Sequence, residues 1–318
     1  MEANTVFYSF VVPIYNDGYL AKDFCTEYEK VFKSYLKTEY ISDKVELIFV
    51  NDGSPDNSIE HLATLHELFP FVRVIDLSRN FGQHIALSAG YAAARGQYVG
   101  MLNVDMEDPP DQIPLMLNEM KGKKLDLLVG MRQKREAGFF KKVTSTVFYS
   151  LLNWLTGNYV PTNAATLRVM SRRFTDAYNS LSEKSRYLPG LETWLGFNSG
   201  YLYITHQQRK KGKSSYNFKR RLSMATESIL SFSDFPLKLI TGFGLLVAVI
   251  GFLLIAILVL QKLFFVNFMP GYTSTVSIIV FLAGVQILVI GMASLYIGRI
   301  LKEVQNRPLY IIKEKYNF

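Results

Sequence analysis

Cysteine is nearly absent from this sequence of 318 residues, which contains only Cys25. A single cysteine excludes a disulfide bond within the chain and a metal site built from a cysteine cluster. Histidine is also scarce. The four histidines, His61, His66, His84 and His206, show no metal-ligand spacing such as HExxH, so we expect an ordinary surface or core role for each.

Charged residues are missing from two long stretches near the C-terminal end. Residues 239–260 and residues 263–298 contain no Asp, Glu, Lys or Arg, and the whole sequence has a mean hydropathy of +0.12. A hydrocarbon core of about 30 Å needs roughly 20 apolar residues in a helix that rises about 1.5 Å per residue. Residues 239–260 and 276–298 satisfy that length, and a short loop with Pro270 and Gly271 joins them. This pattern predicts two transmembrane helices rather than the buried helices of a soluble core.

Basic residues lie on the outer sides of these two apolar runs, whereas the loop between the runs carries only Lys262. Those before the first run are Arg209, Lys210, Lys211, Lys213, Lys219, Arg220, Arg221 and Lys238, and those after the second are Arg299, Lys302, Arg307, Lys313 and Lys315. The positive-inside rule then predicts a multi-pass protein of the cell (inner or plasma) membrane with both termini cytoplasmic. The N-terminal residues lack the pattern of a cleaved signal peptide, so we expect the large N-terminal portion to stay in the cytosol.

The formal net charge of +8 is not taken as a sign of nucleic-acid binding. Residues 201–240 alone contain eight Lys and Arg against Glu227 and Asp234. The basic excess therefore lies where the chain enters the membrane, next to anionic headgroups and phosphates. We expect the lipid bilayer as a partner and no nucleic acid.

Residues 1–215 alternate short β-branched runs with helical patterns. The candidate strands are residues 7–14, 45–50, 72–77, 98–102 and 125–130, and the clearest helices are residues 58–68 and 83–95. This alternation predicts an α/β domain, with a Rossmann-like, mostly parallel sheet and crossover helices.

Three further segments complete the predicted organisation. Residues 139–157 form an apolar and aromatic helical pattern that suits either the core or the membrane interface. Residues 216–238 mix basic, polar and apolar side chains and predict an interfacial amphipathic region. Residues 299–318 are predicted to be a cytoplasmic basic tail.

Polar side chains follow four of the candidate strands, where ligands bind in parallel sheets. The segments read PIYND at residues 13–17, NDGS at 51–54, SRNFG at 78–82 and NVDMEDPP at 103–110. Asp105 and Glu107 fall on one side if the extended backbone continues past the strand. Two such carboxylates suit Mg²⁺ or Mn²⁺, which keep coordination sites open for substrate phosphates. Taken alone, the same run also fits a solvated acidic turn.

Several segments, in order along nearly the whole chain, resemble the GT-A, family 2 glycosyltransferases, and within them the dolichyl- or undecaprenyl-phosphate sugar synthases. They are VPIYN at 12–16, VNDGSPD at 50–56, LSRNFG at 77–82, NVDMEDPP at 103–110, VGMR at 129–132, WLGF at 194–197 and the basic RKKGKSSY at 209–216. The resemblance implies the GT-A fold, and the paired apolar runs match the lipid-phosphate branch.

The resemblance also implies roles for individual residues. The nucleotide-sugar would contact Pro13, Tyr15, Asp17, Asp52, Arg79 and Asn103, with Asp52 on the base. The metal would be held by Asp105 and Glu107. The lipid phosphate would contact Arg132, Arg135, Arg209, Lys213 and Ser214, and the catalytic set would be Asp105, Arg132, Arg209 and Lys213.

Two positions depart from the family pattern. Asn103 stands where the first Asp of the Asp-x-Asp motif is usual, and Thr166 and Leu167 precede Arg168 where many relatives have an Asp. A catalytic carboxylate near Thr166 is therefore not assumed. The second pKa of a phosphate monoester is about 6, so a lipid-phosphate acceptor is already mostly an oxyanion at pH 7 and needs no strong base.

The resemblance implies an inverting transfer of a sugar from a UDP- or GDP-sugar to polyprenyl phosphate. Two alternatives stay open. One is a family 2 enzyme with another lipid or polysaccharide acceptor, against which stand the lack of a Gln-x-x-Arg-Trp segment and the presence of only two apolar runs. The other is a non-catalytic membrane scaffold, which Asn103 and Thr166 alone favour. The sequence leaves the sugar, the base and the oligomeric state open, including a homo-oligomer.

Overall fold

The computed structural model describes residues 6–132, 163–205, 207, 235–264 and 271–318. The chain divides into two compact units. The first contains the described residues up to 207 together with Pro308–Phe318, and the second contains two long helices. The predicted helix at 139–157 and almost all of the predicted interfacial region lie outside the described residues.

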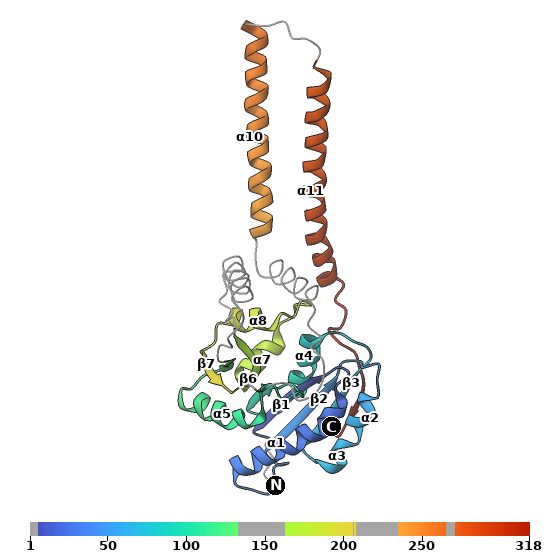
Figure 1. Ribbon diagram of the computed structural model, residues 1–318, viewed down its shortest axis with the longest axis vertical. Coiled ribbons are helices and arrows are strands. Elements are labelled where there is room, and N and C mark those ends of the chain that lie inside the picture. The colour runs from blue at the N-terminus through green and yellow to red at the C-terminus, as the bar shows by residue number, and fades with distance from the viewer. Residues whose placement is uncertain (1–5, 133–162, 206, 208–234, 265–270) are drawn as a thin grey trace. The chain divides into compact units, whose positions relative to one another are not determined.

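An eight-stranded sheet forms the centre of the first unit, in the order β7-β5-β6-β4-β1-β2-β3-β8 (Figure 1). The strands are β1 (Tyr8–Ile14), β2 (Val45–Asn51), β3 (Val72–Leu77), β4 (Tyr98–Met101), β5 (Leu127–Arg132), β6 (Ala164–Ser171), β7 (Ser199–Ile204) and β8 (Ile312–Tyr316). The pairs β1–β2, β2–β3, β1–β4 and β5–β7 are parallel, whereas β4–β6, β5–β6 and β3–β8 are antiparallel. The predicted α/β domain with a mostly parallel sheet is confirmed.

Helices connect the parallel strands and cover the sheet. They are α1 (Ala21–Leu36), α2 (Ser58–Ala63), α3 (Leu65–Leu68), α4 (Gln83–Ala93), α5 (Ile113–Gly122), α7 (Arg172–Ser180) and α8 (Leu188–Trp194), with single 3₁₀ turns η1 (Gly18–Leu20) and η2 (Pro110–Gln112). The predicted helix at 58–68 is wrong as one element, because it is divided at Thr64 into α2 and α3. The predicted helix at 83–95 ends early, since Ala94 has an extended backbone.

Aromatic side chains fill the core between α1 and the sheet. Phe24, Tyr28 and Phe32 repeat along one face of α1 at a spacing of four residues and are fully buried. Tyr28 and Phe32 lie with ring centroids 4.8 Å apart. The repeat places a single apolar stripe of the helix against the sheet, which is why this helix can pack there.

The sheet and α4 approach each other closely at Gly90. A Cβ atom added at this residue would lie 2.2 Å from Cγ1 of Val11 in β1. Only glycine permits this close approach of the helix to the strand.

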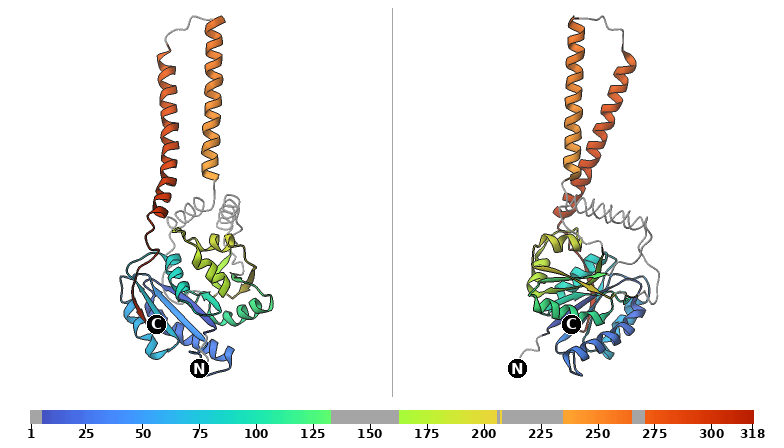
Figure 2. Two further views of the ribbon diagram at one scale, coloured as in Figure 1. Left: turned by 180° about the vertical axis from the view of Figure 1, so that it is seen from behind. Right: turned by 60° about the vertical axis from the view of Figure 1, so that its left-hand side comes forward.

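The second unit contains the two predicted apolar runs. Residues 239–260 lie in α10 (Phe235–Phe264) and residues 276–298 lie in α11 (Tyr272–Val304), which Figure 2 shows in orange and red. Among the described residues, Phe281–Val304 is the one stretch long and apolar enough to cross a membrane, while Ile240–Gly251 is a shorter apolar stretch. The two-helix hairpin through the membrane stays a prediction.

The C-terminal tail has a structure that the sequence analysis did not anticipate. Residues 312–316 lie in the predicted basic tail, but they form β8, which pairs with β3 and is itself an edge strand of the sheet. The tail returns to the first unit after α11 and belongs to it.

Candidate active site

The carboxyl ends of β1, β2 and β3 meet at one edge of the sheet. Ile14 pairs with Asn51, and Asn51 pairs with Asp76, so the loops that follow these strands lie side by side. The predicted donor residues Tyr15, Asp17 and Asp52 are therefore brought to one place, as expected for a parallel sheet.

Asp52 joins the loop after β2 to the loop after β3. Its side chain is buried, and its carboxylate accepts hydrogen bonds from the backbone N–H groups of Phe81, at 2.7 Å, and Gly82, at 2.9 Å. Gly53, with φ +58°, lets the chain turn so closely that a Cβ atom would lie 2.2 Å from the carbonyl carbon of Arg79. Asp52 thus fixes the shape of this edge, and its contact with the base stays a prediction.

Four further predicted donor residues lie on the loops and strand ends near Asp52. Tyr15 is exposed after β1, and Pro13 and Asp17 are half-buried. The exposed Arg79 lies with its guanidinium carbon 4.1 Å from the centre of the Phe81 ring. A nucleotide on this surface would meet aromatic faces and a cation, which suit a base and a diphosphate.

The backbone around Asp105 differs from the extended strand that the sequence analysis assumed. Met106 has φ +55°, and Asp105 accepts a hydrogen bond from the backbone N–H of Glu107 at 3.2 Å, so the chain turns here. The premise that places both carboxylates on one side of a strand is wrong. The shared metal site itself stays a prediction.

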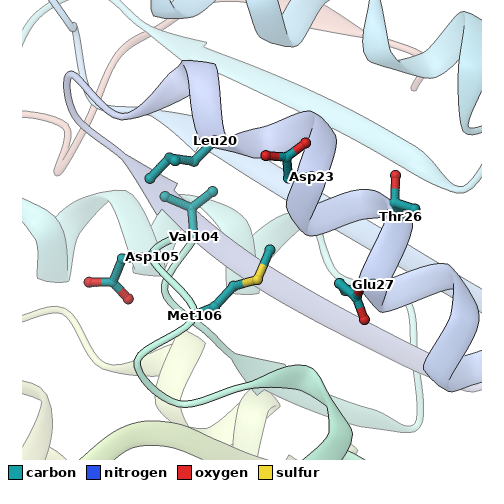
Figure 3. Close-up of a pocket in the computed structure, with 7 residues that line it drawn as sticks. All are labelled: Leu20, Asp23, Thr26, Glu27, Val104, Asp105 and Met106. Atoms are coloured by element: carbon teal, nitrogen blue, oxygen red, sulfur yellow. The ribbon is translucent and has the colours of Figure 1, made fainter. Parts of the chain in front are cut away.

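A cavity of about 310 Å³ adjoins this turn, and Figure 3 shows its lining from α1 and the segment around Asp105. Asp23 and Glu27 of α1 line the cavity, but the Asp105 carboxylate points away from them. Among the described residues no group of three or more His, Cys, Asp or Glu could hold a metal ion. Two carboxylates nevertheless fit Mg²⁺ or Mn²⁺, because such ions are commonly held by one or two carboxylates together with water and substrate phosphates.

Arg132, at the end of β5, is held by a buried acid. Its guanidinium donates to both oxygens of Asp108, from Nε at 3.2 Å and from Nη2 at 3.1 Å, and Nη2 lies 3.6 Å from Glu107 Oε2. Asp108 also accepts a hydrogen bond from the backbone N–H of Thr166 at 2.8 Å. These contacts place a partly exposed cation beside the predicted metal ligand Glu107, and its role in binding phosphate stays a prediction.

The two positions that depart from the family pattern contact each other. Nδ2 of Asn103 donates to Oγ1 of Thr166 at 3.2 Å, and Gln83 at the start of α4 donates to Oδ1 of Asn103 at 3.5 Å. This contact joins the end of β4 to β6 without a carboxylate at either position.

A comparison with protein families matches residues 9–178 to the model described as glycosyl transferase family 2. Proteins with similar sequences match this chain over nearly their whole length. A bactoprenol glucosyl transferase derived from prophage SfII of Shigella flexneri is 34% identical over 314 residues, which cover 97% of this chain and 98% of the relative. The chain belongs to glycosyl transferase family 2.

Two further similarities accompany this one. An uncharacterized glycosyltransferase of Bacillus subtilis (strain 168) is 35% identical over 97% of this chain and 94% of its own length. Among solved structures, glucosyl-3-phosphoglycerate synthase from Mycobacterium tuberculosis, in a complex with UDP, Mn²⁺ and glucosyl-3-phosphoglycerate, has a TM-score of 0.44. It is 17% identical, and the match covers 72% of this chain and 80% of that chain. The family match and the sequence relatives show a glycosyltransferase and therefore speak against the alternative of a non-catalytic scaffold.

The sequence analysis of this glycosyltransferase missed a buried ion pair. Arg168 in β6 donates from Nη1 to both carboxylate oxygens of Glu192 in α8, at 2.9 and 3.1 Å, and burial raises the pKa of Glu192. The pair lines a cavity of about 250 Å³ together with Phe197 and Tyr201. Because Arg168 and Glu192 are 24 residues apart and share no motif, only the packing of α8 on the sheet joins them.

Four predicted residues of the lipid-phosphate site lie outside the described residues. They are Arg135, Arg209, Lys213 and Ser214. Their roles stay predictions, whereas Arg132 has a position and partners in the structure.

Proposed function

We propose that this glycosyltransferase moves a sugar from a nucleoside-diphospho-sugar to polyprenyl phosphate at the cytoplasmic face of the membrane, with inversion at the anomeric carbon. The observation that carries the proposal is the similarity, at 34% identity and nearly full length, to a protein named for transfer of glucose to bactoprenol, a polyprenol. The long apolar stretch Phe281–Val304 supports a membrane-bound acceptor.

The donor nucleotide lies at the ends of β1, β2 and β3. Tyr15 and Arg79 are exposed there and contact the base and the diphosphate, while Asp52 keeps the two neighbouring loops together. Holding both substrates in one place supplies a large part of the rate enhancement, because the reaction then becomes effectively unimolecular.

Asp105 and Glu107 would hold the divalent cation, which would supply positive charge to the departing diphosphate. Arg132 adds a further positive charge from β5, and Asp108 fixes the orientation of its guanidinium. Stabilising the charge that develops on the leaving group is the main task of this site.

The acceptor oxygen needs little help to become a nucleophile. A phosphate monoester with a second pKa of about 6 is mostly dianionic at neutral pH. The neutral pair Asn103 and Thr166 is compatible with this chemistry, since no carboxylate is required at either position to remove a proton. A single displacement by this oxygen inverts the anomeric carbon.

The test is transfer by the purified full-length protein in detergent. The protein is incubated with undecaprenyl phosphate and, one at a time, UDP-glucose, UDP-N-acetylglucosamine, UDP-galactose and GDP-mannose, and lipid products are analysed by mass spectrometry. We expect a single phosphate-linked monosaccharide from one donor, formed only when lipid phosphate is present. A polymer, or no lipid-linked product from any donor, contradicts the proposal.

A further inference from the structure

The chain after α11 returns to the sheet and covers the outer edge of β3. The antiparallel ladder pairs Val74 with Tyr316, and it extends beyond β3 because Ser78 N–H donates to the carbonyl of Ile311 at 3.0 Å. At the other end of β8, Nδ2 of Asn317 donates to the carbonyl of Val72 at 2.7 Å. The tail is therefore held along the whole length of β3, up to the loop that leads into the donor site.

A β-bulge in this ladder brings one tail residue, Lys313, next to a buried carboxylate. Asp76 pairs with Glu314 and Leu77 pairs with Ile312, so Lys313 is the extra residue between them. Its Nζ lies 3.5 Å from Oδ2 of Asp76. The Lys313 side chain is 66% exposed, whereas the Asp76 side chain is only 5% exposed. Bulges commonly re-aim a side chain in this way.

Asp76 begins a series of polar contacts that crosses the strand ends. Nδ2 of Asn51 donates to Oδ1 of Asp76 at 2.7 Å, and Oδ1 of Asn51 accepts from the Ser54 hydroxyl at 2.6 Å. The Ser54 hydroxyl oxygen in turn accepts from the backbone N–H of Asn16 at 3.1 Å. The series ends in the loop of Tyr15 and Asp17, so it joins the tail to two of the loops assigned to the nucleotide.

We infer that β8 completes the donor site and that Lys313 is a positioning residue for nucleotide binding, acting through Asp76 and Asn51. This inference rests on the proposed function, because it takes the loops after β1 and β2 as the nucleotide site. The physical reason is the burial of Asp76: a buried carboxylate needs partners for its charge, and Lys313 is a cation that faces its second oxygen. When Lys313 is removed, Asp76 is less firmly placed, and Asn51 and Ser54 lose their fixed geometry.

The experiment compares Lys313→Met with Lys313→Arg and with Lys315→Met in the full-length protein. Lys315 lies in the same strand, but its Nζ lies over the Phe318 ring at 4.9 Å, so it tests the loss of a tail cation outside the series of contacts. Affinity for UDP and for GDP is measured by calorimetry, and the KM for the donor and kcat are measured separately. Thermal unfolding of each variant reports whether the fold is kept.

For Lys313→Met we expect three- to tenfold weaker binding of the nucleotide that the wild type binds, the same increase in donor KM, and kcat within twofold of the wild type. Lys313→Arg restores binding, and Lys315→Met changes neither constant. In an Asp76→Asn background, Lys313→Met has no additional effect, because the negatively charged partner of Lys313 is already absent.

Unchanged nucleotide affinity in a folded Lys313→Met protein overturns the inference, as does equal weakening by Lys315→Met. If Lys313→Met lowers kcat and leaves donor KM unchanged, the residue acts elsewhere and the inference is also overturned. Failure of the wild type to bind either UDP or GDP overturns the proposed nucleotide site itself, and the role of Lys313 with it.

Discussion

Asn103 and Thr166 contact each other, with Nδ2 of the amide donating to Oγ1 of the hydroxyl at 3.2 Å. They come from separate parts of the sequence, and both belong to segments that depart from the acidic pattern that the family resemblance leads one to expect. Their contact brings the two departures together in space, with Asn103 two residues before the predicted metal ligand Asp105. The predicted loss of one negative charge near the metal is therefore open to a direct test.

Asn103→Asp is expected to lower the concentration of Mg²⁺ or Mn²⁺ that gives half-maximal activity. One added charge near the cation is worth about 1 kcal/mol in a water-like environment, which corresponds to roughly fivefold. The measurement is transfer rate against free metal concentration at saturating donor. Asn118→Asp adds the same charge on α5, where Asn118 accepts from the Tyr35 hydroxyl, and serves as the control. A metal dependence that is identical in wild type and Asn103→Asp contradicts the prediction.

Asp105→Ala is expected to reduce transfer by about 100-fold or more, because the departing diphosphate loses its counter-charge. Asp23→Ala is the matched control. Both residues line one cavity, but the Asp105 carboxylate points away from α1. Rates are measured at saturating donor and metal, and circular dichroism checks the fold. Full activity of Asp105→Ala, or of the wild type in EDTA, would sink the metal hypothesis.

Asp108→Ala is expected to affect both stability and catalysis. The substitution removes the acceptor of two hydrogen bonds from Arg132 and of one from the Thr166 backbone, and it should cost about 2–3 kcal/mol of unfolding free energy. Denaturant unfolding in detergent measures this loss. The lower-charge variant Asp108→Asn should retain part of the stability but not the transfer rate, because the guanidinium is less firmly oriented. Wild-type kcat in Asp108→Asn would show that Arg132 needs no such support.

Introduced cysteines test the predicted membrane orientation. Cys25 is fully buried, and burial raises the pKa of its thiol, so the native cysteine is expected to be unreactive. Gly271→Cys should react with a membrane-impermeant maleimide on intact cells, whereas Gln305→Cys should react only after the cells are opened. The reverse pattern, or labelling of both from outside, contradicts a hairpin with cytoplasmic termini.

Arg209→Ala and Lys213→Ala test the predicted acceptor segment. Each should weaken use of lipid phosphate by about 1–3 kcal/mol if the contact is charge-assisted, because the phosphate lies at the bilayer surface near this basic segment. The comparison is transfer rate against lipid-phosphate concentration, with nucleotide affinity measured by calorimetry. If nucleotide binding is lost instead and the lipid dependence is kept, the segment belongs to the donor site.

The sequence determined the class of this protein and the position of its site along the chain. Short apolar runs that alternate with helical patterns predict a parallel sheet, because a strand in such a sheet buries both of its faces. Each run is a local feature of the sequence and can be recognised without tertiary information. Polar residues that follow four strands predict the site, since the carboxyl ends of parallel strands share one edge. Tyr15, Asp52 and Arg79 fall in these segments, and their roles in donor binding stay predictions. The family resemblance is confirmed by the match over residues 9–178.

The tertiary structure alone decided how these residues are held. Asp105 lies in a turn rather than in an extended strand, because Met106 adopts a positive φ, which no periodicity in the sequence indicates. The pairs Arg132 with Asp108 and Lys313 with Asp76 join residues 24 and 237 positions apart, and β8 was not recognised because its charged residues are typical of a solvated tail. A strand of this kind gains its stability from the unpaired edge of β3, a partner that exists only once the rest of the sheet has folded.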